Sequence, residues 1–186
     1  LTAEALYRKV TRVRHDSYLF AGTVEDNLRM GKADATQKEM EDALLRVDLL
    51  KTIREKGGLA MQLEERAANL SGGQKQRLVL ARALLHDSDI YIFDEATSNI
   101  DVESENRIME VVRGLAREKT VLLISHRLAN VTAADEIFVL QAGTEGIAER
   151  GTHQELMQWQ GYYCRLYEAQ QELESYAGTQ QKEVTV

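Results

Sequence analysis

Two short apolar runs separated by a helical segment constrain the fold of this chain most strongly. Ile90–Phe93 and Thr120–Ile124 have the length and the β-branched and aromatic content of buried strands. The segment from Val102 onwards carries apolar residues at helical spacing between them. Because strands that alternate with helices form parallel sheets covered on both faces, we predict an α/β fold with a mostly parallel sheet.

The rest of the chain predicts further elements around this sheet. Val10–Arg14 favours another strand, and Lys75–Leu85, which is apolar nearly all round, predicts a buried helix. Asp135–Leu140 and Ile147–Arg150 favour a hairpin, and Thr152 is expected to open one long C-terminal helix. Three helix starts have the spacing of a capping box, a threonine three residues before an acid: Thr23 with Asp26, Thr36 with Glu39, and Thr152 with Glu155.

The length, composition and net charge of the chain exclude several classes of protein. A length of 186 residues suits one domain, and the 44% hydrophobic and 28% charged content is ordinary for a globular chain. The net charge of −7 argues against nucleic acid as a partner. No apolar run approaches the roughly 18 residues of a membrane span. The single cysteine, Cys164, excludes an internal disulfide and favours a reducing compartment.

The segment Leu70-Ser71-Gly72-Gly73-Gln74 precedes the predicted buried helix. Backbone N–H groups at a helix start have no acceptor within the helix, and the helix dipole adds positive charge there. This segment is therefore a candidate anion site, to which Ser71 can add a hydroxyl donor. A glycine-rich turn with a serine cap is the alternative interpretation.

Charged and polar side chains follow both predicted central strands. Asp94 and Glu95 end the first, and an acid in that position can hold Mg²⁺ while its neighbour polarises an attacking water. A solvated charged turn is the alternative. His126 follows the second strand, where it could contact a phosphate or have a purely structural role. Ligands of such sheets bind at the carboxyl ends of the strands, where these residues fall.

Together these segments resemble the ATPase domains of ATP-binding-cassette (ABC) transporters in order and spacing. Leu70–Gln74 resembles the signature motif, Asp94-Glu95 the Walker B carboxylates, Ser98–Asp101 the D-loop, and His126 the switch histidine. Val13–Thr23 resembles the Q-loop segment, with His15 where that family usually has glutamine. Gly151–Leu156 resembles the close of exporter-type cassettes.

The resemblance implies ATP and Mg²⁺ as ligands, and two ATPase domains that close head to tail, coupled to a transmembrane domain at the cytoplasmic face of the cell membrane. It implies catalytic roles for Glu95, as general base, and for His126. It implies that Asp94 and His15 lie near Mg²⁺. The implied nucleotide contacts are Leu70, Ser71, Gly72, Gly73, Gln74, His15 and Asp101.

The implied fold is a partial P-loop NTPase (RecA-like) core with the inserted helical subdomain of this family. Residues 1–22 would form the Q-loop strand and loop, and 23–87 the helical subdomain. Residues 88–160 would complete the core, and 161–186 would form a C-terminal helix and tail.

No Gly-x-x-x-x-Gly-Lys-[Ser/Thr] segment occurs in the chain. We therefore expect an ABC domain whose phosphate-binding loop lies upstream of this chain, and no activity from the chain alone. His15 leaves the metal contact of the Q-loop open. Two alternatives stand: a non-catalytic or regulatory cassette half of a heterodimeric transporter, and a chromosome-maintenance or repair ATPase head. The second is less favoured, because no sustained heptads lie between His15 and Leu70.

Overall fold

The computed structural model describes residues 2–98 and 100–183. The chain divides into two compact units, Leu1–Ile124 and Ser125–Val186. The expected boundaries at residues 22, 87 and 160 remain predictions. Leu1, Asn99 in the expected D-loop, and residues 184–186 of the expected tail lie outside the described residues.

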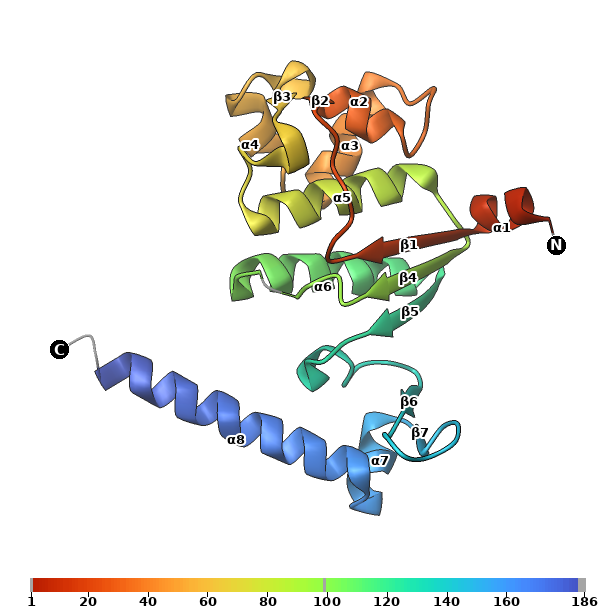
Figure 1. The fold of residues 1–186 in the computed structure, drawn as a ribbon, viewed down its shortest axis with the longest axis vertical. Coiled ribbons are helices and arrows are strands. Elements are labelled where there is room, and N and C mark those ends of the chain that lie inside the picture. Colours follow the sequence, from red (N-terminus) through yellow and green to blue (C-terminus); the bar gives the residue numbers. More distant parts are fainter. Residues whose placement is uncertain (1, 99, 184–186) are drawn as a thin grey trace. The chain divides into compact units, whose positions relative to one another are not determined.

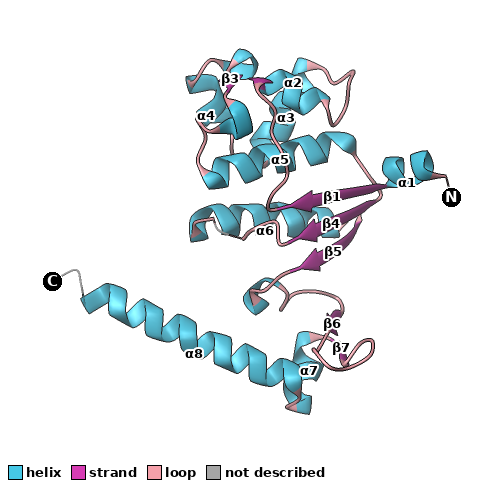
Figure 2. Cartoon of the chain, viewed as in Figure 1, coloured by secondary structure: helices cyan, strands magenta, loops and turns pink. Residues whose placement is uncertain are grey.

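A parallel sheet forms the centre of the first unit. Its strands are β1 (Val10–Arg14), β4 (Ile90–Asp94) and β5 (Thr120–Ile124), in the order β1-β4-β5 (Figures 1 and 2). The buried side chains of Tyr91 and Phe93 lie on one face of the central strand. Two long helices, α5 (Gly72–His86) and α6 (Val102–Ala116), contact this sheet. The predicted α/β class and the parallel sheet are confirmed.

The prediction of a sheet covered on both faces is wrong for the described part of the chain. Leu122 and Ile124 of β5 are 47% and 44% exposed, and Arg12 and Arg14 of β1 are exposed as well. Alternate residues of a strand point to opposite faces, so these side chains share the face opposite Phe93. β5 is therefore an edge strand that is partly buried on one face, and not the buried strand that its composition predicts.

A helical block joins β1 to β4 in sequence. The helices that follow β1 pack with α5, and Val24, Leu28, Leu44 and Leu78 are completely buried. The elements are α2 (Val24–Arg29), α3 (Gln37–Arg46), α4 (Leu50–Glu55), the short pair β2 (Gly22–Thr23) and β3 (Gln62–Leu63), and the 3₁₀ turns η1 (Gly58–Ala60) and η2 (Glu65–Ala67). A short helix that the sequence did not predict, α1 (Ala3–Lys9), precedes β1.

The three predicted capping boxes are all present. In each, the threonine hydroxyl accepts the backbone N–H of the acid three residues on, and the acid accepts the threonine N–H. They start α2, α3 and α7 (His153–Trp159). Reciprocal capping satisfies two otherwise unpaired donors at each helix start, so these boundaries follow directly from local sequence.

The second unit holds a hairpin and two helices. β6 (Ile137–Val139) pairs antiparallel with β7 (Glu149–Gly151), as predicted, and η3 (Leu128–Asn130) precedes them. The prediction of one C-terminal helix is wrong, because Gln160 adopts a left-handed conformation (φ 51°) that ends α7. The next helix, α8 (Tyr162–Glu183), then begins with the Tyr163 N–H donating to Glu149 at 2.9 Å. No helix among the described residues is long and apolar enough to cross a bilayer.

Two glycines of the first unit provide a matched test of packing. A Cβ on Gly31 would lie 2.2 Å from the backbone carbonyl oxygen of Arg82, whereas a Cβ on Gly114 of α6 would meet no atom within 4 Å. We expect Gly31→Ala to lower the free energy of unfolding by about 1–3 kcal/mol through overpacking. Gly114→Ala should raise it by about 0.5–1 kcal/mol, since alanine favours a helix interior. Urea unfolding measures both changes, and equal effects would contradict this packing.

A second prediction concerns acid stability at α3. The Lys32 ammonium, followed by the Thr36 N–H and hydroxyl, lowers the pKa of Glu39 from 4.5 to about 2. Because the folded pKa is lowered, this stabilisation is complete above pH 4.5 and is lost as the pH falls through about 2. In a carboxyl NMR titration, Lys32→Met should raise the pKa of Glu39, while Lys38→Met at a neighbouring exposed lysine should leave it unchanged.

Candidate functional site

The Leu70–Gln74 segment forms the start of α5. Leu70 is buried and anchors the loop, while the Ser71 Oγ accepts the Gln74 N–H at 3.3 Å. The Gln74 side-chain oxygen accepts the Ser71 N–H at 3.1 Å and completes a capping box. Ser71 and Gly72 are exposed. The segment is therefore fixed in shape by its own polar groups while its serine and first glycine face solvent.

Gly73 lies directly against the start of α6. A Cβ at this position would be 2.1 Å from the Ser104 Oγ and 3.2 Å from an Asp101 carboxylate oxygen. Asp101 caps α6, because its other carboxylate oxygen accepts the Ser104 N–H at 2.8 Å. These hydrogen bonds from Ser104 lower the pKa of Asp101. The structure thus brings two predicted site segments together, and only glycine fits between them.

Glu95 follows β4 in a left-handed backbone conformation, with φ at 50°. This conformation is uncommon for a non-glycine residue, and such residues cluster at functional sites. The Glu95 N–H donates to the Ile124 carbonyl oxygen at 3.0 Å, which ties the turn to β5. Beyond the turn, the Thr97 hydroxyl donates to the buried Glu105 at 3.2 Å. Glu95 is therefore held at the carboxyl end of the central strand, as predicted from its position.

The neighbouring carboxylate, Asp94, is paired with a residue that sequence reasoning missed. The Arg12 guanidinium of β1 forms an ion pair with Asp94, and this hydrogen bond is the main cause of the lowered pKa of Asp94. β1 and β4 are adjacent parallel strands in which Arg14 lies opposite Asp94, so Arg12 approaches along the same face. An arginine between apolar strand residues is the signal that could have pointed to this pair.

His15 follows β1 and is linked to α5 through its backbone. The Gln76 side-chain amide donates to the His15 carbonyl oxygen at 2.6 Å. Gln76 is only 6% exposed, and its side-chain oxygen has no hydrogen-bond partner among the described residues. The sequence did not single out Gln76, because it stands in the polar run Gln74-Lys75-Gln76-Arg77 at the start of the helix. This contact connects the loop after β1 to the helix that carries Leu70–Gln74.

The two residues expected near Mg²⁺, His15 and Asp94, differ in the ligand atoms that they offer. Mg²⁺ prefers oxygen ligands, and His15 offers imidazole nitrogen. Asp94 is held by Arg12. Among residues 2–98 and 100–183 there is no group of three or more His, Cys, Asp or Glu residues placed to hold a metal ion.

His126 belongs to the second unit, directly after β5 in sequence. Its carbonyl oxygen accepts the Gln170 side-chain amide at 2.8 Å, and the Leu128 N–H donates to the Gln170 side-chain oxygen at 2.6 Å. Gln170 of α8 therefore fixes the loop that carries His126. His126 lies in the second unit and Asp94 and Glu95 lie in the first, and the two units are not placed relative to each other.

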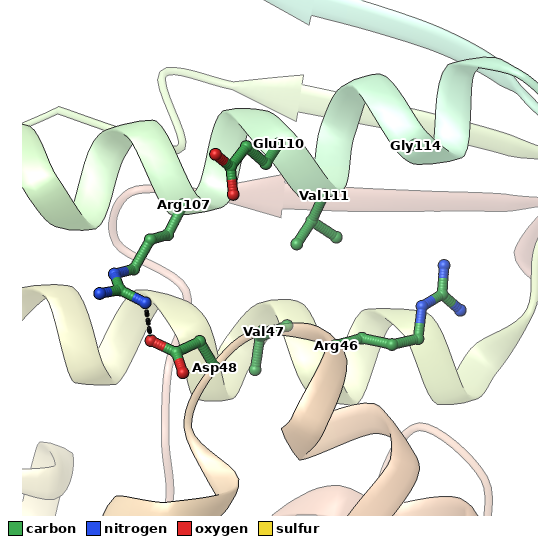
Figure 3. Close-up of a pocket in the computed structure, with 7 residues that line it drawn as sticks. All are labelled: Arg46, Val47, Asp48, Arg107, Glu110, Val111 and Gly114. Atoms are coloured by element: carbon green, nitrogen blue, oxygen red, sulfur yellow. Dashed lines mark hydrogen bonds and ion pairs between the residues drawn. The ribbon is translucent and has the colours of Figure 1, made fainter.

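A shallow surface cavity of about 250 Å³ lies between the end of α3 and α6 (Figure 3). The Arg107 guanidinium forms an ion pair with Asp48 at its edge. Its lining holds two arginines and two acids and none of the predicted site residues: Arg46, Val47, Asp48, Arg107, Glu110, Val111 and Gly114. With balanced charge and no contact with the predicted site, the cavity is not the candidate site.

Comparison with known proteins identifies relatives over most of the chain. A family model described as ABC transporter matches residues 2–98. An uncharacterised ABC transporter ATP-binding protein of Haemophilus influenzae is 52% identical over 170 residues, covering 91% of this chain and 30% of that protein. The mycobactin import ATP-binding/permease protein IrtA of Mycolicibacterium smegmatis is 42% identical over 172 residues, covering 92% of this chain and 20% of that protein.

A solved structure described as a bacterial Atm1-family ABC exporter with ATP bound superimposes with a TM-score of 0.83. It is 33% identical in sequence, and the match covers 91% of this chain and 30% of that chain. This chain therefore spans less than a third of the length of the relatives it matches.

The contact at Gly73 gives a direct test of the site's construction. We expect Gly73→Ala to lower the free energy of unfolding by about 1–3 kcal/mol, because the new Cβ overlaps Ser104. Ser104→Gly removes both overlapping atoms and should recover part of this loss in the double variant. A double-mutant cycle by urea unfolding measures the coupling. Additive effects of the two substitutions would contradict the close approach of α5 and α6.

Proposed function

The chain belongs to the ABC transporter family, and on this premise we propose that it is the ATPase domain of an exporter-type transporter. The observation that carries this proposal is the contact between Gly73 and the Asp101 cap, with Asp94 and Glu95 at the end of the central strand of the same unit. The same unit thereby carries both a candidate phosphate-contacting loop and a candidate base.

In the proposed reaction, water attacks the γ-phosphorus of ATP and the bond to the β-phosphate oxygen breaks, giving ADP and phosphate. Glu95 accepts the proton of the attacking water. The start of α5, through the exposed Ser71 and through Gly73, donates hydrogen bonds to the phosphates of an ATP held mainly by a second ATPase domain. His126 contacts the γ-phosphate, and His15 lies in the loop that senses the nucleotide.

The partners of this proposal are a second ATPase domain in head-to-tail arrangement and a transmembrane domain, at the cytoplasmic face of the membrane. ATP is the substrate, and its phosphates also need the lysine and amide groups of a Gly-x-x-x-x-Gly-Lys-[Ser/Thr] loop, a segment that these 186 residues do not contain. We therefore propose that the 186-residue chain does not turn over ATP by itself.

Export of an unidentified substrate is the direction we propose, because the solved relative is an exporter. The relative IrtA is named for import, so inward transport is the competing direction. A second candidate function, a non-catalytic cassette half of a heterodimer, is favoured by one observation. The pairing of Arg12 with Asp94 occupies the carboxylate that the metal of Mg-ATP needs.

ATP turnover by this chain, and by a version extended upstream through a phosphate-binding loop, tests the proposal. We expect no turnover by the chain and measurable turnover by the extended version. Glu95→Gln should lower the turnover of the extended version by about 10²–10⁴-fold, the usual contribution of a general base. The same change at Glu118, an exposed acid after α6, is the matched control and should have little effect.

The outcomes separate the two candidates. An extended version that binds Mg-ATP in calorimetry but does not hydrolyse it supports the non-catalytic half. Full turnover in the Glu95→Gln variant would remove Glu95 as the base. Turnover by the unextended chain would show that its nucleotide contacts differ from those proposed.

A further inference from the structure

Two arginines on β1 form ion pairs with different acids. Arg12 pairs with Asp94 on the adjacent strand, and Arg14 pairs with Asp16 in the following loop at 3.0 Å. The two arginines are two residues apart on one strand, so they share a face of the sheet. Their side chains are similarly exposed, at 57% and 47%. Of the two arginines, only Arg12 forms an ion pair with a carboxylate of the candidate site. Arg14 therefore serves as the control for substitutions at Arg12.

The charges around Asp94 are mainly positive. Arg12, Arg14 and His15 all act on the Asp94 carboxylate, with Arg12 the strongest, and Glu95 is the adjacent acid. Arg12 donates to the Asp94 Oδ2. A divalent cation that bound this oxygen would have to displace the guanidinium or lie beside it, and like charges at contact distance repel. The Asp94 side chain is 22% exposed, so solvent screens this repulsion only in part.

We propose that Arg12 is a resident cation that competes with a divalent metal ion for Asp94. A metal ion binds this carboxylate when the Arg12 guanidinium leaves it, so Arg12 sets the metal affinity of the strand end. The inference rests on the proposed function in one respect, namely that Asp94 lies beside the metal of Mg-ATP. Arg12 acts through Asp94 and is a positioning residue.

The test is a titration of the nucleotide-free 186-residue chain with MgCl₂, followed by the backbone amide NMR signals of Asp94 and Glu95. Arg12→Gln should lower the Mg²⁺ concentration at half-saturation about two- to fivefold, the range expected for removal of one exposed charge pair. Arg14→Gln removes the same charge from the same strand face and should change it little. Asp94→Asn in the Arg12→Gln background should abolish the gain.

Equal Mg²⁺ affinity in the unsubstituted chain and the Arg12→Gln variant would overturn the inference. Equal gains from Arg12→Gln and Arg14→Gln would also overturn it, because net charge and not pairing would then be the cause. The inference would also be overturned if the Asp94 amide signal showed no Mg²⁺-dependent shift in any variant.

A measurement on the unsubstituted chain tests the inference without depending on whether any variant folds. If Mg²⁺ displaces the guanidinium, the side-chain Nε–H signal of Arg12 should shift in step with the Asp94 amide, while that of Arg14 should not. A stationary Arg12 signal during a saturating shift at Asp94 would contradict competition. These titrations contain no ATP, so their result stands apart from the turnover test of the proposed function.

Discussion

The close approach of α5 to α6 is the constraint on which the candidate site depends. Gly73 leaves no room for a Cβ between its backbone and Ser104, so the two helix starts are held in contact. Most apolar side chains of α5 are buried, including Leu78, Leu80 and Ala81, and this packing holds the helix in place. The exposed end of this rigid helix is therefore presented at one fixed place beside the Asp101 cap.

Hydrogen bonds at the same edge of the sheet keep the carboxylates charged. Asp101 accepts the Ser104 N–H, and Asp94 accepts from Arg12, and each contact lowers the pKa of its acid. Asp94 and Asp101 therefore carry negative charge at neutral pH, and Arg12 and Arg14 offset that charge beside Asp94. The phosphates of ATP are also negative, so the positive end of the α5 dipole and Arg12 are the groups of this unit that offset repulsion.

Local sequence predicted the parts of the fold that local chemistry decides. The capping boxes at Thr23, Thr36 and Thr152 and the strand cores were visible as short-range patterns and are confirmed. Sequence reasoning failed where the answer depends on distant neighbours. Leu122 is exposed because it points to the face of the sheet opposite the buried Phe93, and the left-handed Gln160 divides a continuous helical pattern.

The same contrast between local sequence and distant neighbours holds for the residues of the candidate site. Motif order placed Glu95 and Ser71 at a strand end and a helix start, because those positions are local. Arg12 and Gln76 were missed because their importance lies in the register of two strands and in a contact that spans the helical block. Their roles, like those of the motif residues, are decided by experiment on the site and not by the fold.

Gln76 of α5 is a buried polar residue whose contact reaches the loop after β1. Its amide nitrogen must face the His15 carbonyl, since only the NH₂ group can donate to it, and this leaves the buried amide oxygen with no hydrogen-bond partner in the described part of the chain. A buried unpaired acceptor costs about 1–3 kcal/mol, so an apolar side chain would stabilise α5 more if packing were the only demand. The contact it secures joins the loop after β1 to the helix behind Ser71. This hydrogen bond therefore ties the position of that loop to the position of α5.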